Sequence, residues 1–184
     1  MYYVIASLPE KLARVLEPYR QRFDPLSQVM PAHITIVRPF EFSDQLEKLY
    51  YHLSQVSERH APIRAFLVGW DVHEEKGYQI RLPMTAGRTE FIALHTDLLT
   101  DILGPLADQQ KSYQPYVVFG RFVEQTQLDL AKKSLKEFEP RFSFRVTHME
   151  LWQRDELKQP WSLDRKFSLK ATIAGARGKK QQAV

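Results

Sequence analysis

Apolar and polar positions along this chain follow two periods, one typical of helices and one typical of strands. Apolar residues recur every three or four positions in four segments, which predicts amphipathic helices at residues 10–23, 44–56, 89–102 and 126–138. Shorter alternating or β-branched runs predict strands near residues 1–8, 31–40, 62–72, 78–82, 116–122, 142–152 and 161–171. Gly77 and Pro140 stand at predicted breaks between these elements.

The order of these elements indicates a fold class. Helices alternate with strands, and paired strands end each half of the chain. This order predicts an α+β protein with two pseudo-symmetric lobes, in which helices flank mainly antiparallel sheets and a cleft separates the lobes. No Gly- or Ser-rich linker divides the halves, so we expect a single bilobal domain over residues 1–173. Residues 174–184 are basic and non-periodic, and we expect them to form a flexible tail.

Composition narrows the function classes. The chain has 184 residues, of which 43% are hydrophobic, so it can bury a substantial core. It contains no cysteine, which excludes a disulfide scaffold, a thiolate zinc site and a cysteine nucleophile. The absence of cysteine is compatible with the reducing conditions of the cytoplasm. No apolar run approaches the roughly 20 residues of a membrane span, and the first residues lack the basic start of a signal peptide. The net charge of +4 suits an anionic ligand.

One predicted strand carries candidate chemistry. His33 and Thr35 stand two residues apart in an otherwise apolar run, so their side chains share one face of the strand. An imidazole beside a hydroxyl can bind a phosphate and transfer a proton. The same pair is also typical of a half-buried strand with a hydrogen-bonded histidine, and only the context favours the functional interpretation.

A second predicted strand has a similar context. A proline precedes both runs, and an Arg–Pro–Phe or Arg–Phe sequence follows each of them. Aligning the two runs pairs His33 with Tyr116 and Thr35 with Val118. This weak internal repeat at half-chain scale predicts two related lobes, with all four side chains facing one cleft.

These features together resemble a known family. The chain is similar to the 2H phosphoesterase superfamily, which includes 2'-5' RNA ligase-like proteins and 2',3'-cyclic phosphodiesterases, and within it to a small bacterial branch. Residues 19–25 with 30–35 resemble the first motif, and residues 146–151, Trp161 and 167–169 resemble the last two strands. The resemblance spans about residues 2–170. It implies a cleft in which each lobe supplies one histidine and one hydroxyl, with no metal and no cofactor.

The second motif departs from that pattern. Valine cannot donate a hydrogen bond, and tyrosine, with a reference pKa near 10, is a poor base at neutral pH. Tyr116 can still donate a proton or bind the phosphate. The resemblance therefore implies catalytic roles for His33, Thr35 and Tyr116, with activity reduced by the lost histidine and hydroxyl.

Further residues could bind the substrate. Arg38 and Arg121 follow the two motif strands, and Tyr113 and Trp152 could stack on a base. Among the other histidines, His148 could approach the cleft, whereas His73 precedes a charged turn. No histidine spacing is typical of a metal site, and no Gly-rich phosphate loop is present.

Three hypotheses follow. The first is a metal-independent phosphoesterase-like protein acting on cyclic or 2'-5' phosphodiesters of nucleotides or RNA ends. The second is a non-catalytic module that binds nucleotide or RNA phosphates in the same cleft. The third is a basic protein that binds RNA through its tail and surface. The pair Tyr116 and Val118 is the feature that separates the first two.

Overall fold

The structure is a computed structural model that describes residues 1–74, 76–110, 112–155 and 159–170. Its helices are α1 (Glu10–Phe23), α2 (Leu46–Arg59), α3 (Arg88–Leu98) and α4 (Gln125–Ser134), with 3-10 helices η1 (Pro25–Gln28) and η2 (Asp101–Gln110). Its strands are β1 (Tyr2–Ser7), β2 (His33–Phe40), β3 (Ile63–Val68), β4 (Asp71–Glu74), β5 (Tyr78–Ala86), β6 (Tyr116–Phe122), β7 (Arg141–Val146), β8 (His148–Gln153) and β9 (Ser162–Ser168).

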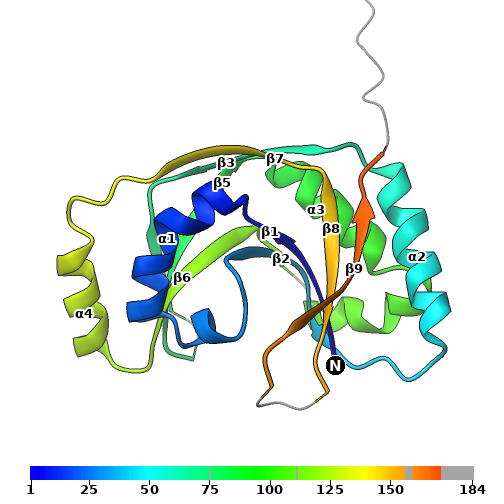
Figure 1. Cartoon of the computed structure of the whole chain (residues 1–184), viewed down its shortest axis with the longest axis horizontal. Coiled ribbons are helices and arrows are strands. Elements are labelled where there is room, and N and C mark those ends of the chain that lie inside the picture. The colour runs from blue at the N-terminus through cyan, green and yellow to red at the C-terminus, as the bar shows by residue number, and fades with distance from the viewer. Residues whose placement is uncertain (75, 111, 156–158, 171–184) are drawn as a thin grey trace, which may run out of the picture.

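These strands form one curved antiparallel sheet (Figure 1). The order is β7-β3-β5-β6-β2-β1-β8-β9, and β4 pairs with β5. The two halves of this order meet where β2 pairs with β6 at Ile34 and Val117, both fully buried. The predicted class, an α+β fold with two lobes built on antiparallel strands, is confirmed.

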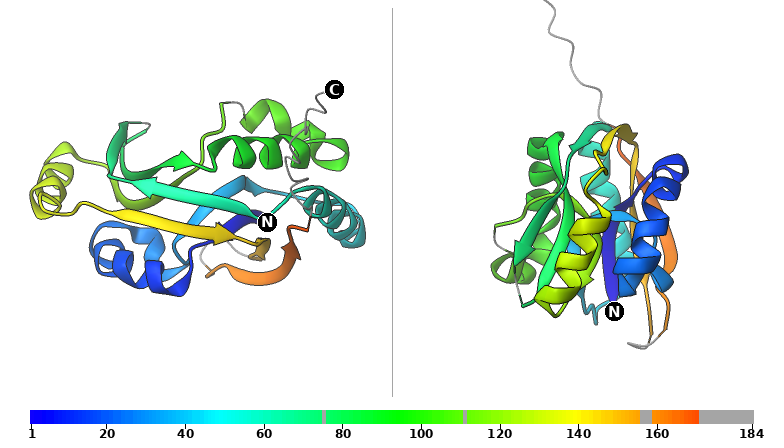
Figure 2. Two further views of the ribbon diagram at one scale, coloured as in Figure 1. Left: turned by 90° about the horizontal axis from the view of Figure 1, so that it is seen from above. Right: turned by 90° about the vertical axis from the view of Figure 1, so that its left-hand side faces the viewer.

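Helices cover each half of the sheet (Figures 1 and 2). On one half, α1 packs on β6, where the ring of Tyr19 lies 6.4 Å from that of Phe119. On the other half, the buried side chains of α2 and α3 pack against the sheet, including Leu53 and Phe91. The helices therefore occupy one face of each half and leave the opposite face to the polar residues of β1, β2 and β6.

Most of the predicted elements are confirmed, because their periodicity is strong. Residues 10–23 form α1, which ends before Asp24 as expected. Two helices begin near, but not at, the first residues of their predicted ranges: Gln45 precedes α2 and Gly87 precedes α3. Gly87 has a φ of 89°, and a Cβ there would lie 2.6 Å from a backbone oxygen, so only glycine fits this start.

Two predicted strands are each divided in the structure. Residues 62–72 form β3 and the start of β4, separated by Gly69 with a φ of 67°. Residues 142–152 form β7 and β8, separated by Thr147, and these two strands lie on opposite halves of the sheet: β7 pairs with β3, and β8 with β1. Periodicity alone cannot show that a continuous run crosses from one lobe to the other.

Of two predictions about the chain as a whole, the described residues test one. No helix in the described ranges is long and apolar enough to cross a membrane. The predicted basic tail at residues 174–184 lies outside the described residues, so its flexibility stays a prediction.

Candidate functional site

A cavity of about 520 Å³ lies where the two halves of the sheet meet, between β2, β6 and the β4–β5 hairpin. Six of the residues singled out in the sequence line it: Thr35, Arg38, Tyr113, Tyr116, Val118 and Arg121. His33 and Trp152 are not among its lining residues.

The pairing of β2 with β6 explains why these residues meet. The strands are antiparallel and pair at Ile34 and Val117. Thr35 and Tyr116 therefore flank that pair on one side, and His33 and Val118 on the other. The flanking side chains are partly exposed on one face, whereas Ile34 and Val117 are buried on the other. The weak sequence repeat thus corresponds to two strands that touch.

His33 does not line the cavity, and two groups hold its ring. Its Nδ1 is 2.7 Å from the carbonyl oxygen of Pro31, and its Nε2 is 2.8 Å from the hydroxyl of Tyr3. The same hydroxyl is 2.5 Å from Thr35 Oγ1. Tyr3 therefore connects the two residues of the first motif. Sequence reasoning assigned Tyr3 only to a first strand, because nothing local shows that β1 pairs with β2.

The surroundings of His33 and Tyr3 favour the neutral form of both side chains. Burial lowers the pKa of His33 to about 4, the Pro31 carbonyl opposes this shift, and the positive charges of Arg121 and Arg20 add to it. Burial likewise raises the pKa of Tyr3 to about 12. At neutral pH, His33 is therefore an uncharged imidazole and Tyr3 an uncharged phenol.

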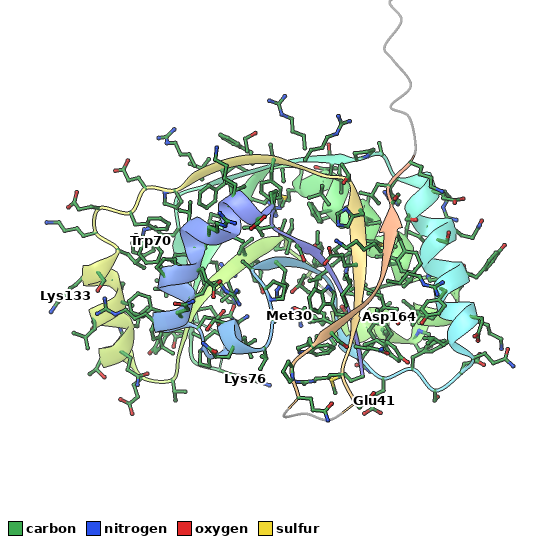
Figure 3. All side chains as sticks on the ribbon, viewed as in Figure 1. Met30, Glu41, Trp70, Lys76, Lys133 and Asp164 are labelled. Atoms are coloured by element: carbon green, nitrogen blue, oxygen red, sulfur yellow. The ribbon has the colours of Figure 1, made fainter. Side chains whose placement is uncertain are left out.

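A buried carboxylate holds one of the cavity arginines. Asp24 lies between Arg20, whose Nε is 3.4 Å from it, and Arg121, whose Nη1 is 2.5 Å from it. Arg20 also donates to the carbonyl oxygen of Met30 at 2.7 Å. The side chain of Met30, labelled in Figure 3, belongs to a small buried cluster with Ile5 of β1. In the sequence, Asp24 follows the predicted helix and lies in the stretch 19–25 that resembles the first family motif. Its contact with Arg121 joins residues 97 positions apart, so no local signal could reveal it.

The aromatic residues of the cavity are also held in place. The guanidinium of Arg81 lies 4.7 Å from the ring centre of Tyr116, and its Nε is 3.0 Å from Asp71. Tyr113 donates its hydroxyl to the carbonyl oxygen of Thr35 at 2.7 Å and stacks on His95 at 4.0 Å. Tyr113 thus has a role that the sequence did not suggest: it supports the backbone of β2 beside Thr35.

Trp152 lies apart from the cavity, on β8. Its indole nitrogen donates to Glu150 at 2.8 Å, and its ring packs near Ile5 and Trp161. Trp152 does not line this cavity, since β1 and β2 separate β8 from β6 in the sheet, and its role in base stacking stays a prediction. His148 also contacts Glu150, at 3.0 Å.

The other residues that line the cavity were not proposed for the site from the sequence: His73, Glu74, Gln79, Arg81, Ser112 and Gln114. His73 and Gln79 face each other across β4 and β5, and both line the cavity. In the sequence, His73 was only a residue before a charged turn. The pairing of β4 with β5 brings it to the cavity, and the sequence predicted this hairpin but not the face on which His73 lies.

Comparison with solved structures defines the class of fold. The protein TT0787 of Thermus thermophilus superposes with a TM-score of 0.65 at 18% identity, covering 92% of this chain and 97% of that one. Escherichia coli LigT in its apo form superposes with a TM-score of 0.60 at 17% identity, with the same coverage. LigT has also been solved in complex with NADP+ and with 3'-AMP. The chain therefore shares its fold with TT0787 and LigT.

Sequence comparison then identifies the family. Residues 8–158 match the 2'-5' RNA ligase superfamily, so the chain belongs to it. A Bacillus licheniformis protein whose curated name provisionally calls it a phosphoesterase is 35% identical over 65 residues, which cover 34% of this chain and 38% of that protein. The family predicted from the His33 motif and its surroundings is confirmed.

Proposed function

We propose that this protein binds, and slowly cleaves, cyclic or 2'-5' phosphodiesters of nucleotides or RNA ends, without a metal ion. The observation that carries this proposal is the position of Thr35 and Tyr116, which are neighbours across β2 and β6 in a cavity that also contains Arg38, Arg81 and Arg121. Two hydroxyls and several guanidinium groups around one space form a site suited to a phosphate.

The charges of the cavity support binding of an anion. Guanidinium groups match the oxygens of a phosphate in pairs, which makes arginine well suited to this ligand. Arg81 and Arg121 are each oriented by an aspartate, Asp71 and Asp24. These ion pairs fix the direction of both guanidinium groups before a ligand arrives, which lowers the entropic cost of binding.

The acid–base groups support slow rather than fast turnover. Cleavage of a phosphodiester by water needs a base on one side of the phosphate and an acid on the other. His33 is neutral at pH 7, but its pKa of about 4 makes it a weak base on the β2 side. On the β6 side only the phenol of Tyr116 is available near Val118, and a phenol donates less readily than an imidazolium at this pH.

Binding without turnover is the second candidate. Two observations favour it: His33 does not line the cavity, and Val118 offers no hydrogen bond to the phosphate. LigT in complex with 3'-AMP shows that a protein of this fold can hold a nucleotide phosphate. The two candidates share one site and differ only in the rate of the chemical step.

The test is hydrolysis of adenosine 2',3'-cyclic phosphate by the purified protein in the presence of a chelator. We expect slow turnover that His33→Ala abolishes. The double change Tyr116→His with Val118→Thr restores an acid–base group and a donor, and should raise the rate by about 10²-fold or more.

The matched control is the same double change combined with His33→Ala, which should be inactive. A fast wild-type rate that is insensitive to His33→Ala would contradict the proposed roles. No turnover by either the wild-type protein or the double variant, together with tight binding of 3'-AMP, would establish the binding module instead.

A further inference from the structure

Tyr3, His33 and Thr35 form a hydrogen-bonded chain whose direction is set at one end. The carbonyl oxygen of Pro31 can only accept, and it lies 2.7 Å from His33 Nδ1, so Nδ1 carries the proton. In the neutral ring, Nε2 then has only a lone pair. The hydroxyl of Tyr3, 2.8 Å away, must therefore donate to Nε2.

The remaining hydrogen bond follows from this arrangement. The hydroxyl of Tyr3 has given its hydrogen to His33, so at 2.5 Å from Thr35 it must accept the hydrogen of Oγ1. Thr35 lines the cavity, but its only hydroxyl hydrogen points away from it. In this state Thr35 presents lone pairs to the cavity, and lone pairs repel an anion.

One added proton reverses the chain. When solvent supplies a proton to His33 Nε2, both ring nitrogens donate, and Nε2 donates to the oxygen of Tyr3. The hydrogen of Tyr3 then turns to Thr35 Oγ1, and the hydrogen of Thr35 turns to the cavity. Only hydroxyl rotations accompany this proton uptake, and no other bond forms or breaks. Thr35 changes from an acceptor to a donor toward the ligand.

We propose that Tyr3 is a positioning residue that relays the protonation state of His33 to Thr35, so that an anion in the cavity and a proton on His33 bind cooperatively. This inference rests on the proposed function, because it takes the cavity as a phosphate site. By linkage, an anion that binds tenfold more tightly to the protonated form raises the pKa of His33 by about one unit.

Other charged groups face this chain, and their contributions must be separated from the relay. The pKa of His33 is also affected by three charged residues: Arg20 of α1, Asp24, and Arg121 of β6. The pKa of Tyr3 is affected by Arg38, Arg121 and Tyr116. On β1, Ser7 pairs with His33 and donates its hydroxyl to Glu150 of β8. The hydrogen bonds of the Tyr3 hydroxyl to described residues go to His33 and Thr35, so removing that hydroxyl tests the relay alone.

The experiment follows the His33 ring by NMR during a pH titration, with sulfate as the probe and chloride at matched ionic strength as the reference. Sulfate is tetrahedral like phosphate and keeps its charge across the titration. In the wild-type protein, we expect sulfate to raise the pKa of His33 by about one unit. In Tyr3→Phe and in Thr35→Val, we expect an equal, much smaller rise that reflects charge attraction without the relay.

The control is Tyr2→Phe, the same change at the adjacent position, where the ring packs on Phe40 instead of His33. This variant should keep the full sulfate effect. Tyr3→Phe retains the ring that packs between His33 and Trp161, so the fold should be preserved. A full sulfate effect in Tyr3→Phe would overturn the relay.

A second measurement separates the relay from the proposed function. The ¹⁵N shifts of His33 without any anion should report a proton on Nδ1 and a hydrogen-bonded Nε2, and Tyr3→Phe should remove that bond. A proton on Nε2 of the neutral ring would overturn the relay even if sulfate binds. If the shifts are as expected but sulfate does not bind the wild-type protein, the proposed phosphate cavity fails, and with it the coupling to an anion.

Discussion

On the face of the sheet opposite the helices, hydrogen bonds between neighbouring strands fix the positions of individual side chains. Glu150 is 2% exposed and accepts from Ser7, His148, Trp152 and Lys166 at 2.5 to 3.1 Å. Burial alone would raise the pKa of Glu150, but these hydrogen bonds outweigh it and hold the pKa below its usual value. For His33, burial outweighs the opposing hydrogen bond to the Pro31 carbonyl and so determines the protonation of the ring.

The pKa of His33 predicts a dependence of stability on pH. Its folded value, about 4, lies below the ordinary value of 6.5, so the unfolded chain binds more protons between these values. The free energy of unfolding should therefore fall as pH decreases from 6.5 towards 4, by up to about 3 kcal/mol at about 1.4 kcal/mol per pKa unit. Glu150 contributes in a lower window, because its stabilisation is lost only as pH falls through its depressed pKa.

Urea unfolding at about pH 7 and about pH 4.5 measures this slope. His33→Gln should flatten this slope. An equal slope in wild-type and His33→Gln proteins would contradict the assignment to His33.

At the scale of elements, periodicity predicted which segments are helices and strands, but not their partners. Residues 10–23 show helical spacing and form α1 as expected. Residues 142–152 show one continuous strand pattern, yet Thr147 divides them between the two halves of the sheet. The alternation of side chains depends on the strand itself, whereas its partner depends on distant residues.

The β4–β5 hairpin supplies an element-scale prediction. Gly77 has a φ of 116°, and a Cβ there would lie 2.7 Å from the backbone oxygen of Phe122. Gly77→Ala should therefore destabilise the protein by about 1–3 kcal/mol and displace Gln79 and Arg81 from the cavity. Gly104→Ala is the matched control, because nothing lies within 4 Å of the added atom. Urea unfolding and sulfate binding measure both effects, and equal results for the two variants would contradict the prediction.

At the scale of the whole molecule, positive charge is present both in the cavity and at the end of the sequence. The cavity contains Arg38, Arg81 and Arg121, while Arg177, Lys179 and Lys180 follow Gly175. The first group surrounds a space suited to one phosphate. The second group belongs to the third hypothesis, in which the tail binds RNA through charge alone.

Deletion of the chain after Gly175 separates these two sites. We expect weaker, less salt-dependent binding of single-stranded RNA, with the slope of log affinity against log salt reduced by about 2 for three lost cations. Sulfate binding in the cavity should not change. Fluorescence anisotropy at several salt concentrations measures the slope. RNA binding that disappears with the tail and ignores His33→Ala would support the third hypothesis over the other two.

Local patterns in the sequence therefore determined the helices, most strands, the shared face of His33 and Thr35, and the absence of a second imidazole at Tyr116. These features depend only on the period of the backbone and on the identity of nearby residues. Tertiary structure alone decided that Tyr3 joins His33 to Thr35, that Asp24 orients Arg121, and that Trp152 lies apart from the cavity. Each of these outcomes depends on which strands and helices become neighbours, and this is set by packing of the whole core rather than by the spacing of residues along one segment.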